Sequence, residues 1–155
     1  MTCAPRIRPG DAGFTLVELM VVLFIVGLMA GAVLLAMPDP RGRLADEGER
    51  FAARLKAAHD LAIVDNRPMA AVIGPSGYHF EERRAGAWQA VDAKPLEAAG
   101  WSPQTEVVTG EEDGQLRVHF DVTGLADPSA TVTLMREGAE FRVSIDAGGA
   151  VRVDD

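Results

Sequence analysis

The sequence predicts an α+β fold in which a long N-terminal helix, partly transmembrane, leads into a helix packed on antiparallel β-sheets. Three observations predict this fold. An apolar run covers residues 14–37, apolar residues recur every three or four positions over about residues 44–65, and short segments of alternating polarity fill residues 69–154. Helical spacing indicates a helix with one buried face, and one-sided alternation indicates antiparallel strands with one buried face.

Residues 14–37 are long enough to cross a bilayer as a helix. About 24 helical residues span about 36 Å, which exceeds the roughly 30 Å of a hydrocarbon core. Glu18 is the only charged residue in this run, and 14 of the others are Leu, Ile, Val or Phe. These side chains favour insertion by more than the few kcal/mol that one carboxylate costs. We therefore expect a transmembrane helix, and Glu18 requires a separate explanation.

Two simpler kinds of segment also have to be weighed for the N-terminus. Arg6 and Arg8 ahead of the run are typical of a secretory signal peptide. The run itself, however, is about twice as long as the apolar region of such a peptide. The sequence at its end, LLAMPDP, is also a poor cleavage site. A plain signal anchor, in which Glu18 is incidental, agrees better with the length and remains an alternative.

Gly27 and Gly31 have the GxxxG spacing inside the apolar run. Small residues at this spacing allow two helices to approach closely in a membrane or a bundle. Glycine also weakens a helix by about 1 kcal/mol per residue. Close packing and local weakening of the helix both remain open as the role of these glycines.

A second, amphipathic helix is predicted from about Leu44 to Asp65. Pro38 and Pro40 before it predict a bend, because proline cannot donate a helical hydrogen bond. Asn66 after it is a typical C-terminal stop. The predicted apolar face, which we expect to lie across a sheet, consists of Leu44, Gly48, Phe51, Leu55, Ala58 and Ala62. Polar residues, Glu47 among them, are expected on the other sides of the helix.

The remainder of the chain predicts short strands joined by turns. The strand-like segments are, in order, MAAVI, GYHFE, AWQAV, QLRVHF, TVTLM, EFRVSI and AVRV. The sequences GPSG and RRAG have turn compositions, and REGAE and DAGGA predict hairpin turns. Residues 92–114 are expected to be mostly loop, with a possible strand at TEVV.

Composition excludes several classes of function. The net charge of −8 disfavours nucleic acid as a partner, because phosphates would not be neutralised. The chain lacks a nucleophile elbow, a glycine-rich phosphate loop and a metalloprotease motif, so we expect neither an enzyme nor a bound cofactor. The single cysteine, Cys3, precedes the apolar run and cannot form a disulfide within the rest of the chain. Trp88 and Trp101 are expected in the core or at its rim.

A metal site is not expected either. His59, His79 and His119 are predicted on a helix and two separate strands, with no metal-ligand spacing. His119 alternates with apolar residues and is therefore expected to face solvent. The acidic loop over residues 110–115 is most simply a solvated loop, although its carboxylates leave a bound cation as an alternative.

The N-terminal region resembles the class III signal of type IV pilins and pseudopilins. The residues that carry the resemblance are a short basic leader, Gly13, Phe14 and, four residues beyond, Glu18, within GFTLVEL. The resemblance implies that a prepilin peptidase cleaves between Gly13 and Phe14 and methylates the new N-terminus. Residues 1–13 would then be a leader peptide, residues 14–37 a transmembrane and assembly helix, and residues 38–155 a periplasmic domain.

The same resemblance implies a role for Glu18 in assembly. In pilin-like filaments, the carboxylate at this position pairs with the amine of the first residue of a neighbouring subunit, here Phe14. A carboxylate within a membrane is stabilised by a nearby cation. Pairing of Glu18 with the amine of its own chain remains the alternative, because residues one helical turn apart share a face.

Two longer segments resemble the H-type minor pseudopilins of type II secretion and their minor-pilin relatives. They are RFAARLKAAHDLAIVDNRPMAAVI and FDVTGLADPSATVTL with the closing GGAVRV. The resemblance implies a subunit at or near the tip of the periplasmic pseudopilus, which drives export of folded proteins across the outer membrane. It implies a single-pass inner-membrane protein whose partners are major and minor pseudopilins, the prepilin peptidase and the inner-membrane assembly platform.

Two other functions remain open at this point. The first is a minor pilin of a type IV pilus, involved in priming, adhesion or DNA uptake. The second is a signal-anchored periplasmic binding domain that never assembles. The short C-terminal sequence VRVDD does not resemble the calcium-binding loop of major pseudopilins.

Overall fold

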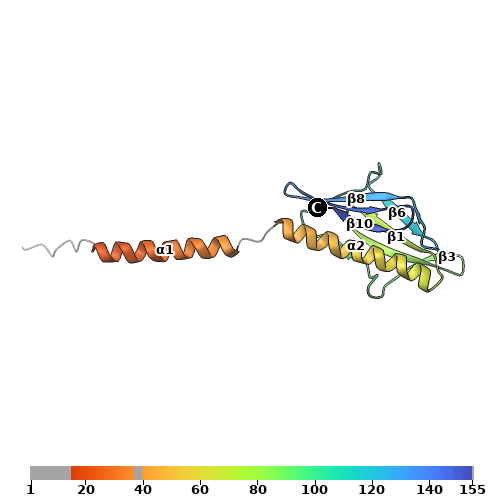
Figure 1. Ribbon diagram of the computed structural model, residues 1–155, viewed down its shortest axis with the longest axis horizontal. Coiled ribbons are helices and arrows are strands. Elements are labelled where there is room, and N and C mark those ends of the chain that lie inside the picture. Colours follow the sequence, from red (N-terminus) through yellow and green to blue (C-terminus); the bar gives the residue numbers. More distant parts are fainter. Residues whose placement is uncertain (1–14, 37–39, 155) are drawn as a thin grey trace, which may run out of the picture. The chain divides into compact units, whose positions relative to one another are not determined.

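The computed structural model describes residues 15–36 and 40–154 of the chain. These residues belong to two units divided between Pro38 and Asp39, and each unit is described by itself. The first contains a single helix, α1 (Leu16–Ala36), and the second, the head domain, contains helix α2 (Pro40–Val64) and ten strands (Figure 1). Gly13 and Phe14, the residues of the predicted cleavage site, lie outside the described residues.

The strands begin and end within the range that the sequence predicts. In chain order they are β1 (Met69–Gly74), β2 (Gly77–Arg84), β3 (Ala87–Ala90), β4 (Ala99–Gly100), β5 (Glu106–Val108), β6 (Leu116–Phe120), β7 (Ala126–Asp127), β8 (Ala130–Arg136), β9 (Ala139–Ile145) and β10 (Val151–Asp154). The possible strand at TEVV is β5, and β4 and β7 are two-residue strands that no sequence pattern predicts.

The strands form two antiparallel sheets, as the one-sided alternation predicts. The first has the order β3-β2-β1-β6-β7, with β4 also paired to β2, and the second has the order β10-β9-β8-β5. Ala85 and Gly86 between β2 and β3, with φ of +49° and +85°, form one tight hairpin turn. Glu137 and Gly138 between β8 and β9, with φ of +50° and +81°, form another. Two successive positive φ angles match the twist of the flanking strands.

Helix α2 begins at Pro40, earlier than the start predicted near Leu44. The bend was predicted within MPDPRGR, of which residues 37–39 lie outside the described residues. Proline is favoured in the first turn of a helix, where its missing N–H has no intrahelical partner. Asn66 is the predicted stop: its φ is +49°, and the N–H of the next residue, Arg67, donates to the carbonyl of Ala62 at 3.1 Å. This left-handed residue is a common way to end a helix.

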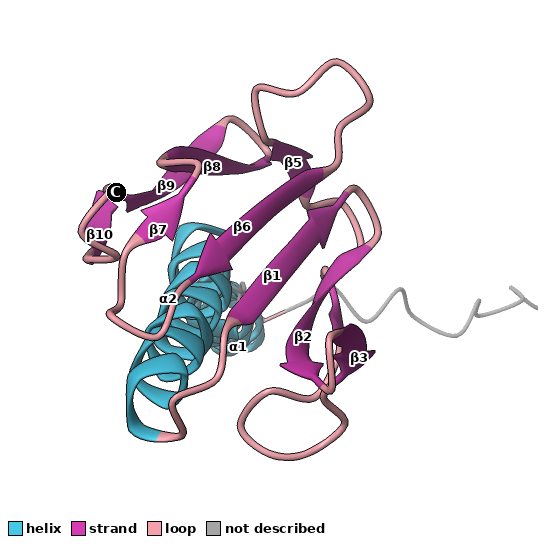
Figure 2. Cartoon of the chain, turned by 90° about the vertical axis from the view of Figure 1, so that its right-hand side faces the viewer, coloured by secondary structure: helices cyan, strands magenta, loops and turns pink. Residues whose placement is uncertain are grey.

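The apolar face of α2 packs against strands of both sheets, and Figure 2 shows the helix along one side of the strands. Phe51 lies at the centre of this contact and is fully buried. Its ring centroid is 4.7 Å from that of Tyr78 and 5.2 Å from that of Trp101. The other fully buried large side chains include Leu44, Leu55, Ile73, Phe80, Leu96, Val118, Phe120, Val132, Leu134, Val143 and Ile145. The predicted apolar face of α2 is confirmed.

Glu47, one of the polar residues expected on the sides of α2 away from its apolar face, is buried. Its side chain is buried against the loop between β4 and β5, where one carboxylate oxygen accepts the backbone N–H of Ser102 at 2.6 Å. The other oxygen accepts the hydroxyl of Thr105 at 2.9 Å. In the same loop, the carbonyl of Pro103 accepts a hydrogen bond from buried Arg136 of β8 at 2.7 Å. The loop is thus held to α2 and to β8 by two charged side chains.

Gly48 has no room for a side chain, so Gly48→Ala is expected to destabilise the head domain. An added Cβ would lie 2.1 Å from Cδ1 of Phe141. Alanine normally stabilises a helix by about 0.5–1 kcal/mol relative to glycine, whereas overpacking costs about 1–3 kcal/mol. Thermal unfolding of the full chain in detergent, followed by circular dichroism, would measure the change. Ala53→Gly, at an exposed position of α2, is the control for helix propensity alone. A Gly48→Ala head as stable as the parent would contradict the contact.

Candidate assembly site

Helix α1 begins with a capping interaction that involves Glu18. The backbone N–H of Glu18 donates to Oγ1 of Thr15 at 3.2 Å. Threonine followed three residues later by glutamate is the spacing of a capping box. The cap places the Glu18 carboxylate in the first turn of α1, where the helix dipole favours negative charge. The sequence-based predictions omit Thr15, although the Thr-x-x-Glu spacing would have identified it.

Glu18 is exposed, and α1 contains no basic residue that could pair with it. A cation for its carboxylate must therefore come from outside α1. In an apolar environment an unpaired carboxylate is costly.

The surface of α1 is apolar on all sides. Every large apolar side chain described from Leu16 to Met29 is 47–75% exposed. A helix with this character is stable when it is surrounded by lipid or by other helices. Among the described residues, no helix is both long enough and apolar enough to span a membrane.

Gly27 and Gly31 lie on a different side of α1 from Glu18. At about 100° per residue, the nine positions from Glu18 to Gly27 amount to a rotation of about 180°. A Cβ added at either glycine would meet nothing within 4 Å. The chain itself therefore does not require glycine at these positions, and a packing role depends on a second helix. Glu18 and the two glycines therefore lie on opposite faces of α1 and do not form one site.

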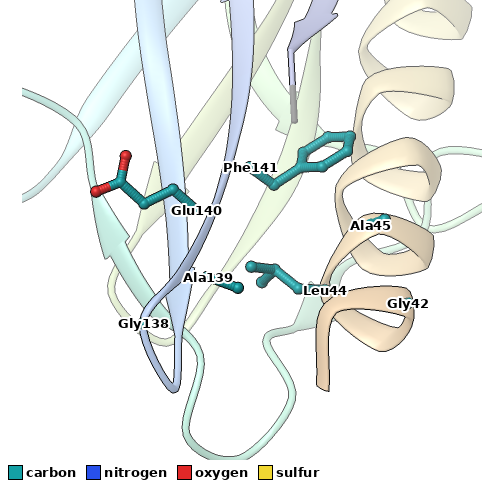
Figure 3. A pocket seen from close by; sticks show the side chains of 7 residues that line it. All are labelled: Gly42, Leu44, Ala45, Gly138, Ala139, Glu140 and Phe141. Carbon is teal, nitrogen blue, oxygen red and sulfur yellow. The ribbon is translucent and has the colours of Figure 1, made fainter. Parts of the chain in front are cut away.

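The head domain has a groove beside the first turns of α2. We call it the α2–β9 groove; its volume is about 480 Å³. It is lined by Gly42, Leu44, Ala45, Gly138, Ala139, Glu140 and Phe141 (Figure 3). The sequence did not predict this groove, because α2 and β9 are far apart along the chain.

The three histidines are as scattered as predicted, on α2, β2 and β6. The described residues contain no group of three or more side chains suited to hold a metal ion. In the acidic loop over residues 110–115, the Asp113 carboxylate accepts the backbone N–H of Gln115 at 3.0 Å and so closes a local turn.

His119 is more enclosed than predicted. Its ring centroid is 5.2 Å from that of Trp88, and the guanidinium of Arg117 lies 5.1 Å from the Trp88 ring on the same sheet face. Burial, followed by the nearby Arg117 cation, lowers the pKa of His119 below its ordinary value. Trp101 lies at the rim of the core, as expected, and its indole N–H donates to the carbonyl of Gly74 at 2.9 Å.

Two family models match this chain, one within each of the two units. Residues 8–34 match the prokaryotic N-terminal methylation motif, and residues 47–149 match the family described as type II transport protein GspH. The chain belongs to the GspH family. This GspH-family chain is 32% identical over 111 residues to type II secretion system protein H of Aeromonas hydrophila. That match covers 69% of the chain and spans 61% of the length of the relative.

Solved structures show the same fold. The minor pseudopilin EpsH from the type II secretion system of Vibrio cholerae superimposes with a TM-score of 0.61 at 17% identity, over 72% of this chain and 95% of EpsH. The type IV minor pilin FimU of Pseudomonas aeruginosa superimposes with a TM-score of 0.57 at 17% identity, over 74% of this chain and 90% of FimU. The predicted pilin-like fold is confirmed, as is the predicted resemblance to H-type minor pseudopilins.

Proposed function

We propose that this GspH-family protein is a minor pseudopilin of a type II secretion system, positioned at or near the tip of the periplasmic pseudopilus. The observation that carries the proposal is the combination, in one chain, of the methylation motif at residues 8–34 with the GspH match at residues 47–149. The apolar run over residues 14–37 anchors the chain in the inner membrane, with the head domain in the periplasm. Assembly then transfers this run from lipid into a bundle of helices.

The two faces of α1 give this transfer a physical basis. Cleavage after Gly13 creates a cationic amine on Phe14, and this amine pairs with Glu18 of a neighbouring subunit. Thr15 holds the first turn of α1 in place while the pair forms. On the opposite face, Gly27 and Gly31 allow another helix to approach closely. Charge pairing sets which subunits lie side by side, and close packing supplies contact area.

The role is one of assembly, and it involves no catalytic step and no cofactor. The partners are major and minor pseudopilins, the prepilin peptidase that processes the precursor, and the inner-membrane assembly platform. The net charge of −8 disfavours nucleic acid as a partner.

A minor pilin of a type IV pilus is the second candidate function. The TM-score to FimU, 0.57, is close to that to EpsH, 0.61, so the fold is compatible with either kind of filament. Deletion of the chain separates the two functions. A secretion pseudopilin is required for export of folded proteins, whereas a minor pilin is required for surface pili.

The mature chain is expected to begin at N-methylated Phe14. Mass spectrometry of the protein extracted from membranes would measure this directly. A Gly13→Leu chain is the control, and it is expected to keep its leader and Cys3. An intact leader on the parent chain, or cleavage near Ala36, would exclude processing by a prepilin peptidase and support the signal-anchored binding domain.

A further inference from the structure

A polar pocket of the head domain lies between α2 and the chain around β4. We call it the α2–β4 pocket; its volume is about 260 Å³. It is lined by three charged side chains of α2, by Tyr78 of β2 and by residues of β4 and the loop that follows. The wall at β4 lies close against β2, because a Cβ added at Gly77 would be 2.3 Å from the carbonyl oxygen of Ala99. A few convergent polar side chains in a small pocket are typical of a site for a small polar group.

Tyr78 is the buried member of this lining. It is 7% exposed, and its ring centroid is 4.7 Å from that of Phe51 and 4.8 Å from that of Trp101. Burial raises the pKa of Tyr78, and the charges that act on it are those of Arg54, Glu47 and Arg50, the three charged residues of the pocket. The Tyr78 hydroxyl therefore lies near all three and stays protonated, so it can donate a hydrogen bond to a ligand.

Arg50 and Arg54 both keep donors for a ligand, since an arginine side chain has five N–H groups. Nε of Arg50 donates to the carbonyl of Asp46 at 2.9 Å, and none of the ion pairs in the described part of the chain involves Arg50. Nη1 of Arg54 donates to the carbonyl of Glu97 at 3.1 Å. The Glu97 carboxylate is 3.7 Å from Nη2 of Arg54 and 41% exposed, so a ligand can replace it.

The charges of the lining favour an anion with a single negative charge. Glu47 is the one carboxylate among the lining residues, and both of its oxygens already accept hydrogen bonds, from the Ser102 N–H and the Thr105 hydroxyl. Two guanidinium groups and this carboxylate leave the lining with a net charge of +1. Guanidinium groups bind carboxylates through paired, charge-assisted hydrogen bonds. A doubly charged phosphate would be opposed by the buried charge of Glu47.

We propose that the α2–β4 pocket binds a carboxylate group, which accepts hydrogen bonds from Arg50, Arg54 and Tyr78. The carboxylate belongs to a small organic acid or to an acidic side chain of another protein, and the volume admits either. This site goes beyond the proposed function, because neither α1 nor Glu18 takes part in it.

Binding can be measured by NMR on the isotope-labelled full chain in detergent, at constant ionic strength. Propionate, which has the carboxylate end of a glutamate side chain, is the probe, and propionamide is its uncharged counterpart. Tyr78 is the only tyrosine of the chain, so its ring signal reports on the pocket alone. The indole signal of Trp88 on β3, which does not line the pocket, is the reference. Propionate is expected to shift the Tyr78 signal to saturation and to leave the Trp88 signal unchanged. No shift, an equal shift with propionamide, or tighter binding of phosphate would overturn the proposal.

Arg50→Gln is expected to weaken propionate binding by about tenfold, because it removes a charged donor. Lys56→Gln removes the same charge from an exposed position of α2 outside the pocket and should leave the affinity unchanged. Tyr78→Phe, followed by the amide signal of Gly100, keeps the ring and removes the hydroxyl, so it should also weaken binding. Equal affinities of the Arg50→Gln and Lys56→Gln chains would contradict the site. If Tyr78→Phe does not fold, this pair of exposed substitutions decides the outcome.

Photo-crosslinking in cells distinguishes the two sources of the carboxylate. The photoreactive residue p-benzoylphenylalanine replaces Ala98, which is exposed next to the lining residue Ala99. A protein crosslink that is lost in the Arg50→Gln chain and kept in the Lys56→Gln chain identifies an acidic side chain of another protein. Saturable propionate binding by the purified chain, without a crosslink that depends on Arg50, identifies a small organic acid.

Discussion

A Glu18→Ala chain is expected to reach the membrane and fold its head domain, but to fail in assembly. The substitution removes a charge from an otherwise apolar run, so insertion should be at least as favourable as in the parent. Glu18 is remote in sequence from every strand, and the head domain, from Asp39 onward, is a separate unit. The cap on α1 also survives, because the backbone N–H of residue 18 still donates to Oγ1 of Thr15.

What the Glu18→Ala chain loses is the carboxylate for a neighbouring N-terminal amine. Removing one partner of a buried ion pair costs about 3–5 kcal/mol, because the remaining charge is left uncompensated. This loss corresponds to a reduction in association of more than a hundredfold. We therefore expect the variant to accumulate in the inner membrane without crosslinking to partner pseudopilins and without supporting secretion.

Three further variants separate charge, reach and helix capping. Glu18→Gln keeps the size and polarity of the side chain but removes the charge, and it should behave like Glu18→Ala. Glu18→Asp keeps the charge on a shorter side chain and should be intermediate. Thr15→Ala removes the cap, at about 0.5–2 kcal/mol, but keeps the carboxylate, so its effect on assembly should be smaller. If the Glu18→Ala chain secretes and crosslinks as well as the parent, the pairing of Glu18 with a neighbouring subunit is contradicted. Glu18 would then pair only with the N-terminal amine of its own chain.

Phe51→Ala is expected to have the largest effect on the stability of the head domain. Phe51 is fully buried on α2, and its ring contacts Tyr78 and Trp101, which belong to β2 and to the loop after β4. Truncating a buried phenylalanine to alanine costs about 3–5 kcal/mol, against a total stability of about 5–15 kcal/mol for a typical domain. The variant should therefore unfold at a markedly lower temperature.

The control for Phe51→Ala is Ile63→Ala on the same helix, where the side chain is 43% exposed. It removes a large apolar side chain without opening an enclosed cavity, and its cost should be well below that of Phe51→Ala. Near-UV circular dichroism of the full chain in detergent, recorded against temperature, measures the unfolding temperatures of both variants. Equal losses in the two variants would show that Phe51 is not the centre of the core.

The elements of this protein could be predicted because their patterns are local. The apolar run over residues 14–37, the apolar face that includes Phe51, and the alternation in β6, β8 and β9 each follow from spacing within one segment. The start of α2 at Pro40, earlier than the predicted start near Leu44, was missed for a related reason. Within its own segment, a proline is compatible both with a bend and with the first turn of a helix.

Local sequence patterns are enough to predict the signal at Gly13 and Phe14, the isolated charge of Glu18, the faces of α2 and the antiparallel character of the sheets. The burial of Glu47, the contact of His119 with Trp88 and the groove between α2 and β9 are visible only in the folded chain. Periodicity indicates which side of an element faces inward, whereas these three features depend on which distant segment lies opposite. That choice is made by strand register and by packing across the whole core.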